Sequence, residues 1–416
     1  MCGIVGAVAQ RDVVPILIEG LRRLEYRGYD SAGIAVLSGT GTIKRLRAVG
    51  KVRMLQDALD ADPTSGQLGI AHTRWATHGV PSERNAHPHI SRDGIALVHN
   101  GIIENHEELR AELQAAGYEF TSETDTEVIA HRVHYHVQKT RDLFKAVRAT
   151  VAELEGAYAL AVISQKDPER LVLARQGCPV VIGLGDGENF VASDVAALLP
   201  VTRKFIFLEE GDVCEIRRDS YRILDRDGNT IQRKVHESEL SADAAEKGDF
   251  PHYMLKEIHE QPRAVAQTLE ERVAGGKLLE AAFGPAAQTV FAQTEAVRIV
   301  ACGTSFHAAS VAKYFIEQIC RLPCWVEIAS EYRYRNPVVP KNTLFVSVSQ
   351  SGETADTLAA LRMAKQAGYL SQLAICNVPE SSLVRESDLV MLTRAGPEIG
   401  VASTKAFTTQ LTALGM

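Results

Sequence analysis

Met1-Cys2-Gly3-Ile4-Val5-Gly6 begins the chain, and the apolar run continues to Ala9. Such a run predicts a buried strand, which would hold the terminus inside a folded core. A small residue at position two generally allows removal of the initiator methionine, which would leave Cys2 with a thiol and a free α-amine. That amine has a pKa of about 8, so it can serve as the base for its own thiol. The alternative is an ordinary cysteine at a frayed terminus.

The composition indicates a globular protein with more than one domain. A chain of 416 residues exceeds what one core usually organises, so two or three domains are expected. The net charge of −7 argues against a general nucleic-acid-binding or membrane-surface role. No apolar run reaches membrane-spanning length, and we expect no signal peptide ahead of Cys2. The cysteines are scattered without metal-site spacing, which favours a reduced, cytoplasmic protein.

A short strand predicted at residues 95–98 runs into His99-Asn100-Gly101. An Asn-Gly pair at a strand end is most often a simple turn. The functional alternative is an oxyanion hole, in which the Asn100 side-chain amide and the Gly101 N–H face developing negative charge. A thiol that attacks an amide needs this pair of donors.

Two polar segments carry groups suited to the two ends of an amino acid. Arg74 follows a predicted strand, and its planar guanidinium suits an α-carboxylate, with Thr77 and His78 as further hydrogen-bond partners. Asp125 lies in the segment Ser122–Glu127, which has the pattern of a helix capping box. The Asp125 carboxylate can instead bind an α-ammonium group, and both interpretations can hold together.

The same half of the chain holds a loop with Arg27 and Gly28, which is either a plain turn or a wall of a site. Histidines also crowd this region, so a metal site has to be considered. Their spacing matches no helical pair of metal ligands, and acidic partners with ligand spacing are missing. We therefore predict no metal; the histidines are at positions 72, 78, 87, 89, 99 and 106.

The pattern of the chain changes near residue 240. Residues 156–235 contain many short strands separated by turns, which favours stacked sheets with helices outside. Residues 236–250 shift to polar, small and charged residues, as expected at a domain boundary. Beyond them strands alternate with helices, and this alternation predicts a parallel, doubly wound sheet.

Three loops of this second part combine hydroxyl side chains with glycine. Each is expected at a strand end, where the N–H groups of a following helix can bind phosphate. Any one of them can be ordinary helix capping, but two at corresponding strand ends favour a phosphate site. A Walker lysine is missing, so a nucleotide triphosphatase is not predicted. The candidate residues are Thr304 and Ser305, then Ser349, Gln350, Ser351 and Thr354, and in the third loop Val401 and Ser403.

With these motifs in view, the chain resembles the glutamine–fructose-6-phosphate aminotransferase (isomerising) family, the glucosamine-6-phosphate synthases, along essentially its whole length. The N-terminal motifs are shared with other class II amidotransferases, and their joining to a sugar isomerase (SIS) domain points to this family. The resemblance implies an α+β N-terminal-nucleophile glutaminase domain over residues 1–240 and a linker with a helical lead-in over 241–285. It implies an α/β doubly wound SIS domain over 286–416, incomplete at its end. The family's second SIS domain is absent, so we expect a truncated chain.

The resemblance also implies roles for the candidate residues. Cys2 would attack the amide of L-glutamine, with Asn100 and Gly101 as the oxyanion hole and Trp75 gating the passage of ammonia. Glutamine would be bound by Arg74, Thr77, His78, Asp125, Arg27 and Gly28. The loop residues named above would bind D-fructose 6-phosphate, which is converted to D-glucosamine 6-phosphate for amino-sugar synthesis.

No cofactor is implied, and a homodimer through the SIS part is expected where that part is complete. The alternatives are a half-enzyme that only hydrolyses glutamine and a non-catalytic fragment that binds a sugar phosphate. An amidotransferase acting on phosphoribosyl diphosphate is disfavoured, because the acidic-pair loop for the diphosphate is not visible.

Overall fold

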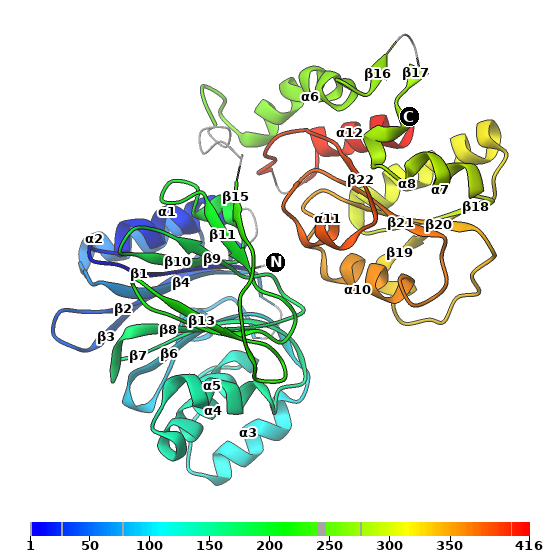
Figure 1. The fold of residues 1–416 in the computed structure, drawn as a ribbon. Coiled ribbons are helices and arrows are strands. Elements are labelled where there is room, and N and C mark those ends of the chain that lie inside the picture. Colours follow the sequence, from blue (N-terminus) through cyan, green and yellow to red (C-terminus); the bar gives the residue numbers. More distant parts are fainter. Residues whose placement is uncertain (1, 26–27, 77–78, 239–246, 275–276, 401) are drawn as a thin grey trace. The chain divides into compact units, whose positions relative to one another are not determined.

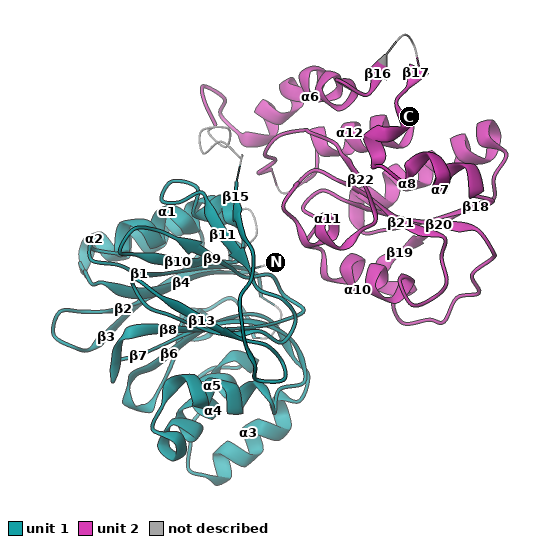
Figure 2. Ribbon diagram, viewed as in Figure 1, with its two compact units in different colours: residues 1–242 teal, residues 243–416 magenta. Residues whose placement is uncertain are grey.

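A computed structural model describes residues 2–25, 28–76, 79–238, 247–274, 277–400 and 402–416. The chain divides into two compact units, Met1–Ala242 and Asp243–Met416 (Figure 2). Four candidate site residues lie outside the described residues, namely Arg27, Thr77, His78 and Val401.

Two antiparallel sheets stack at the centre of the first unit (Figure 1). The first sheet has the order β15 (Val235–Glu237), β11 (Lys204–Phe207), β9 (Val181–Leu184), β10 (Asn189–Ala192), β1 (Gly3–Val8), β4 (Leu68–Arg74), β2 (Ser31–Leu37) and β3 (Ile43–Val49). The second has the order β14 (Thr230–Ile231), β13 (Tyr221–Leu224), β12 (Val213–Ile216), β8 (Asp167–Gln176), β7 (Gly156–Ser164), β6 (Ile95–Ile103) and β5 (His89–Ser91).

Helices cover the outer faces of both sheets. One apolar cluster joins the first sheet to α1 (Val14–Leu24) and α2 (Val52–Ala61). Another joins the second sheet to α4 (Asp125–Thr140) and α5 (Leu143–Val151), and α3 (His106–Ala115) packs against α4. A third apolar cluster lies between the sheets. The predicted stacked-sheet α+β fold is confirmed.

Strand β1 shows why the chain begins with an apolar run. It lies between β10 and β4, and all its residues are buried. Val5 belongs to the cluster beneath the helices, whereas Ile4 belongs to the cluster between the sheets. A strand that is buried on both faces is continuously apolar instead of alternating. At Gly3 an added Cβ would lie 2.7 Å from the Leu24 Cβ, so the strand start packs closely against α1.

The second unit contains a parallel five-stranded sheet with helices on both faces (Figure 1). Its order is β19 (Cys324–Ile328), β18 (Ala296–Ala301), β20 (Thr343–Ser349), β21 (Ser371–Cys376) and β22 (Leu389–Leu392). One face packs against α7 (Ala287–Gln293), α8 (Gly303–Phe315) and α12 (Lys405–Leu414). The other packs against α9 (Ala329–Tyr332), α10 (Ala355–Ala364) and α11 (Ser382–Glu386). The predicted doubly wound sheet is confirmed.

A lead-in precedes this sheet, formed by α6 (Tyr253–Leu269) and the short strands β16 (Val273–Ala274) and β17 (Lys277–Leu278). The sequence pattern predicts a helix over residues 307–319, but α8 begins at Gly303. Gly303, Thr304 and Ser305 were expected in a loop but form its first turn, because the chain turns into the helix directly after an extended Cys302. In the described part of the chain, no helix is both long and apolar enough to cross a membrane.

Replacing Phe345 by alanine should destabilise the second unit. This β20 side chain is fully buried and packs against the rings of Tyr332 and Tyr369. Truncating a buried Phe costs about 3–5 kcal/mol. Urea unfolding followed by circular dichroism measures the loss. Tyr334→Ala is the control, since this tyrosine is 79% exposed and its removal should stay within about 0.5 kcal/mol.

Candidate functional site

Cys2 lies immediately before β1, beside the end of β4. The register pairs Gly3 with Thr73, so the residues after β4 come next to the chain start. The Trp75 N–H donates to the Cys2 Sγ at 3.2 Å, and the Trp75 carbonyl oxygen lies 3.5 Å from the same sulfur. Burial raises the pKa of the Cys2 thiol, although the Trp75 N–H acts in the opposite direction. The thiol is therefore protonated at neutral pH and needs a base to become a nucleophile.

Asn100 and Gly101, on β6 of the second sheet, come close to this terminus. The Asn100 Nδ2 donates to the Cys2 carbonyl oxygen at 3.1 Å. Gly101 has φ of +131°, and an added Cβ would lie 1.9 Å from the Ala157 carbonyl oxygen. Only glycine fits there, because both the backbone angle and the neighbouring strand exclude a side chain. The structure thus brings the Asn100 amide to the backbone of Cys2, and Gly101 follows Asn100 on the same strand.

Arg74 and Gly28 also meet. Arg74 is the last residue of β4 and is buried, and its Nη2 donates to the Gly79 carbonyl oxygen at 3.1 Å. A Cβ at Gly28 would lie 2.8 Å from the Arg74 carbonyl carbon, so this glycine permits close contact between two backbones. Asp30 stabilises the segment after β4. Its N–H donates to the Arg74 carbonyl oxygen, and its carboxylate accepts the Ala76 N–H.

Asp125 is the first residue of α4 and is buried. Its Oδ2 accepts the Ile103 N–H at 2.9 Å, which joins the start of α4 to the end of β6 just beyond Gly101. The Trp75 ring, by contrast, is 44% exposed and meets the Tyr29 ring edge-on at 5.3 Å. The carboxylate is thus held in place, and the indole is open to solvent.

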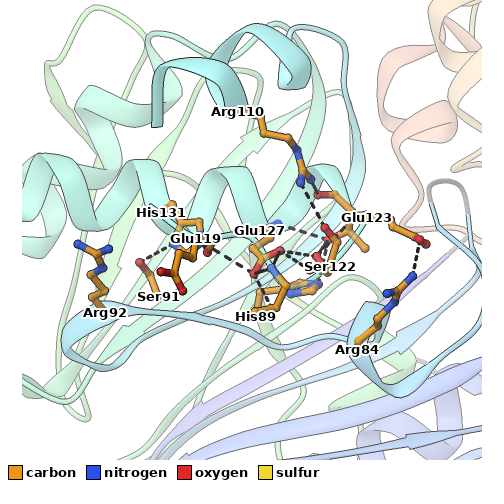
Figure 3. A network of polar contacts seen from close by, with 12 residues as sticks. Arg84, His89, Ser91, Arg92, Arg110, Glu119, Ser122, Glu123, Glu127 and His131 are labelled. Atoms are coloured by element: carbon orange, nitrogen blue, oxygen red, sulfur yellow. Dashed lines mark hydrogen bonds and ion pairs between the residues drawn. The ribbon is translucent and has the colours of Figure 1, made fainter. Parts of the chain in front are cut away.

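The segment before α4 is held by Glu127 in an arrangement that differs from the predicted capping box. Thr124 is the N-cap and accepts the Glu127 N–H, as expected. The Glu127 carboxylate, however, does not return to the cap N–H. Thr121 and Ser122 each donate to it through both the backbone N–H and the hydroxyl group. Figure 3 shows Ser122 beside Glu127. The carboxylate therefore clamps the loop that leads to Asp125.

Asn85 connects this loop to the segment after Arg74, and sequence reasoning missed it. Its Nδ2 donates to the Val80 carbonyl oxygen and to the Glu123 Oε2, at 2.9 and 3.0 Å. Its Oδ1 accepts the Glu123 N–H at 3.0 Å. Nothing in the local sequence marks this asparagine, because its partner Glu123 lies 38 residues further along the chain.

Three buried histidines of this unit, His72, His87 and His89, are neutral. Burial lowers the pKa of His72 to about 3 and also lowers the pKa of His87 and His89 well below the usual value. Over the described ranges, no group of three or more His, Cys, Asp or Glu side chains has the arrangement of a metal site.

In the second unit, the first two candidate loops lie side by side. Strands β18 and β20 are parallel neighbours that pair Ala301 with Val348, so the loops that follow them leave the same sheet edge. Thr304 and Ser305 lie in the first turn of α8, and the other loop leads to α10. The Ser349 Oγ accepts the Gly352 N–H at 3.0 Å and lies 3.5 Å from the Thr354 Oγ1.

Ser351 and Gln350 complete this second loop. The Ser351 Oγ accepts the Glu353 N–H at 3.2 Å, and the Gln350 carbonyl oxygen accepts the Asn377 N–H at 3.3 Å. The hydroxyl groups of the loop thus order its own backbone. Local Ser/Thr capping and a phosphate site both use such hydroxyl groups.

Two carboxylates that sequence reasoning missed hold the third loop. Ser403 donates through its hydroxyl group to the Glu398 Oε2 at 3.0 Å, and the Glu398 Oε1 accepts N–H groups at the start of α12. The Oε1 of Glu257, from α6, accepts the Ile399 and Gly400 N–H groups at 2.6 and 2.9 Å. Burial raises the pKa of Glu257, against the effect of these donors.

Comparison with known proteins agrees with the two units. Residues 72–200 match the glutamine amidotransferase domain family, and residues 291–416 match the SIS domain family. The chain is 62% identical over 414 residues to the glutamine–fructose-6-phosphate aminotransferase (isomerizing) of Pseudomonas putida, and 61% identical to that of Pseudomonas aeruginosa. Each alignment covers 100% of this chain and 68% of the relative.

This chain belongs to that aminotransferase family. A solved C-terminal domain of the corresponding aminotransferase from Francisella tularensis is 57% identical to it, covers 41% of this chain and 48% of that one, and has a TM-score of 0.40. The family assignment agrees with a class II amidotransferase fold in the first unit and an SIS fold in the second.

In this aminotransferase, the Glu127 clamp should make stability depend on pH. Burial opposes ionisation of Glu127, but the N–H and hydroxyl donors of Thr121 and Ser122 outweigh it and lower its pKa. Ionised Glu127 therefore stabilises the fold above the unfolded pKa, and this contribution disappears as the pH falls through the lowered folded pKa. Glu127→Gln should cost about 1–3 kcal/mol at pH 7.

Urea unfolding between pH 3 and pH 8 measures this effect. The difference between parent and variant should shrink below about pH 4, where the parent carboxylate becomes protonated as well. Exposed Glu155 provides the control, and Glu155→Gln should show neither effect. A constant difference across the pH range would contradict the clamp.

Proposed function

We propose that this protein transfers the amide nitrogen of L-glutamine to D-fructose 6-phosphate, giving D-glucosamine 6-phosphate and L-glutamate for amino-sugar synthesis. The membership of the family supports the overall reaction. The observation that carries the glutamine half is the hydrogen bond from the Asn100 Nδ2 to the Cys2 carbonyl oxygen, because it puts an amide donor next to the residue that bears the thiol, as attack on an amide requires.

In the glutamine half, the Cys2 Sγ attacks the amide carbon and its proton passes to the free α-amine. Negative charge develops on the amide oxygen, where the Asn100 Nδ2 and the Gly101 N–H stabilise it. The α-ammonium group of Cys2 then returns the proton to the departing nitrogen, so that collapse of this intermediate expels ammonia and leaves a glutamyl thioester, which water hydrolyses to glutamate. No cofactor is required.

Two oppositely charged side chains bind the two charged groups on the α-carbon of glutamine. Arg74 binds the α-carboxylate and Asp125 binds the α-ammonium group, and burial of both side chains strengthens these interactions. Gly28, Arg27, Thr77 and His78 complete the pocket, and Trp75 gates the passage of ammonia. The exposed indole is compatible with a movable gate.

In the sugar half, the phosphate of D-fructose 6-phosphate binds at the edge where β18 and β20 end. The first turn of α8 and the loop before α10 offer N–H groups there. The binding residues are Thr304, Ser305, Ser349, Gln350, Ser351 and Thr354, with Val401 and Ser403 from the third loop.

We further propose that the protein acts in the cytoplasm as a homodimer and binds no nucleic acid. Exposed apolar side chains gather on α8, on the turn after it and on edge strand β19, and contact between two copies would remove this surface from water. The most exposed of them are Tyr314 at 70% and Ile319 at 73%.

Cys2→Ala should abolish the reaction, because no other thiol has the terminal amine and the Asn100 amide beside it. Glutamate and glucosamine 6-phosphate are measured in one reaction with both substrates. The parent should form them in equal amounts, and the variant should form neither above background. Exposed Cys320 provides the control, and Cys320→Ala should match the parent.

Other results would decide between the alternatives. Glutamate without the sugar product would support the half-enzyme that only hydrolyses glutamine. Glutamate release by the variant at the parent's rate would refute the thiol mechanism. Met1 retained in the purified protein, as determined by intact mass, would favour the non-catalytic interpretation, because the α-amine of Cys2 would then be blocked.

Ile319→Lys should weaken the dimer at least tenfold, because the lysine charge would have to be desolvated in the contact. Sedimentation velocity over a concentration series measures this association. The control is Met54→Lys, since Met54 lies on α2 of the first unit and is 49% exposed. This change should leave the association unaltered. A parent that sediments as a monomer would contradict the dimer.

A further inference from the structure

His72 is a buried residue of β4 to which the proposed mechanism gives no role. Its side chain is fully enclosed, and it reaches from the first sheet to β6 of the second. Its Nε2 lies 3.0 Å from the Asn100 Oδ1 and 3.1 Å from the His99 carbonyl oxygen. The His72 ring therefore contacts the oxygen of the Asn100 amide, the group whose nitrogen is the predicted oxyanion donor.

The hydrogen-bond partners define the tautomer of this ring. A backbone carbonyl oxygen only accepts, so the contact with the His99 oxygen requires a proton on the His72 Nε2. The ring is neutral, because burial lowers its pKa to about 3, so Nδ1 carries no proton. Among the described residues the His72 Nδ1 has no hydrogen-bond partner, which suits an unprotonated nitrogen. The His87 Nδ1, 3.2 Å from the same Nε2, must also be an acceptor there.

The tautomer in turn defines which way the Asn100 amide points. Because the His72 Nε2–H donates to Oδ1, the amide oxygen faces His72 and Nδ2 faces Cys2, where it donates to the carbonyl oxygen at 3.1 Å. In the flipped amide, two N–H donors would face each other at His72. The amide oxygen would then face the Cys2 carbonyl oxygen and the charge that develops during attack.

We propose that His72 is a positioning residue that holds the Asn100 amide with its nitrogen toward the reacting glutamine amide. The inference rests on the proposed glutaminase function and adds to it the residue that orients the oxyanion donor. His72 touches neither substrate nor thiol in this role. It acts only through Asn100, so its effect on catalysis should vanish when Asn100 is removed.

His72→Phe keeps a flat ring but deletes the donor. We expect kcat for glutamine hydrolysis to fall about 10²-fold, as when an oxyanion donor is lost, with KM within about twofold of the parent. His72→Gln restores an N–H donor at a similar reach and should recover at least tenfold of this loss. The matched control is His134→Phe, since His134 is buried in the same unit but bonds to the Tyr118 hydroxyl group.

Two further measurements separate positioning from general damage. The double variant with His72→Phe and Asn100→Ala should have a kcat less than twofold below that of Asn100→Ala alone, because the amide that His72 orients is already gone. Alkylation of Cys2 by iodoacetamide develops no oxyanion, so its rate in His72→Phe should stay within twofold of the parent rate.

Three results would overturn the inference. The kcat losses of His72→Phe and Asn100→Ala could multiply independently in the double variant, alkylation of Cys2 could be slower in His72→Phe, or His72→Gln could be no more active than His72→Phe. An unchanged kcat in His72→Phe would overturn it while leaving the glutaminase function intact. Absence of glutamine hydrolysis in the parent would instead refute the proposed function itself.

Discussion

Burial of β1 on both faces is the constraint on which the first unit depends. The strand lies between β10 and β4, so the residue that precedes it cannot move away from the sheet. Cys2 is thereby held against Trp75, which follows β4 of the first sheet, and against Asn100 on β6 of the second. The apolar side chains that stabilise the stacked sheets also keep the thiol in place, so stability and catalysis draw on the same packing.

In both units, buried carboxylates order loops by accepting hydrogen bonds from backbone N–H groups. Glu127 holds the loop before α4, and Glu398 holds the start of α12. Glu257 holds Ile399 and Gly400, just after Glu398 in the chain. Each one satisfies donors that would otherwise be buried without partners. Each one fixes a loop that carries or adjoins candidate binding residues.

Much of the fold was predictable because its signals are local. A continuous apolar run marked β1, and the alternation of strands with helices marked the parallel sheet. Sequence reasoning left α2, α5 and β3 without an assignment. Every residue of β3 from Ile43 to Ala48 is only partly buried, so no clear alternation of apolar and polar positions marks this edge strand. The predicted capping box failed in detail because the Glu127 carboxylate found better partners outside the helix.

The sequence by itself determined the two domain types, and it predicted the nucleophile and the polar motifs around it, since each depends on residue types at short spacing. Only the tertiary structure decided that Asn100 reaches Cys2, that Asn85 joins two loops and that His72 orients the amide. Those contacts join side chains on different strands and loops. Their geometry follows from how the two sheets stack and how the loops are clamped, and no local pattern of residues encodes it.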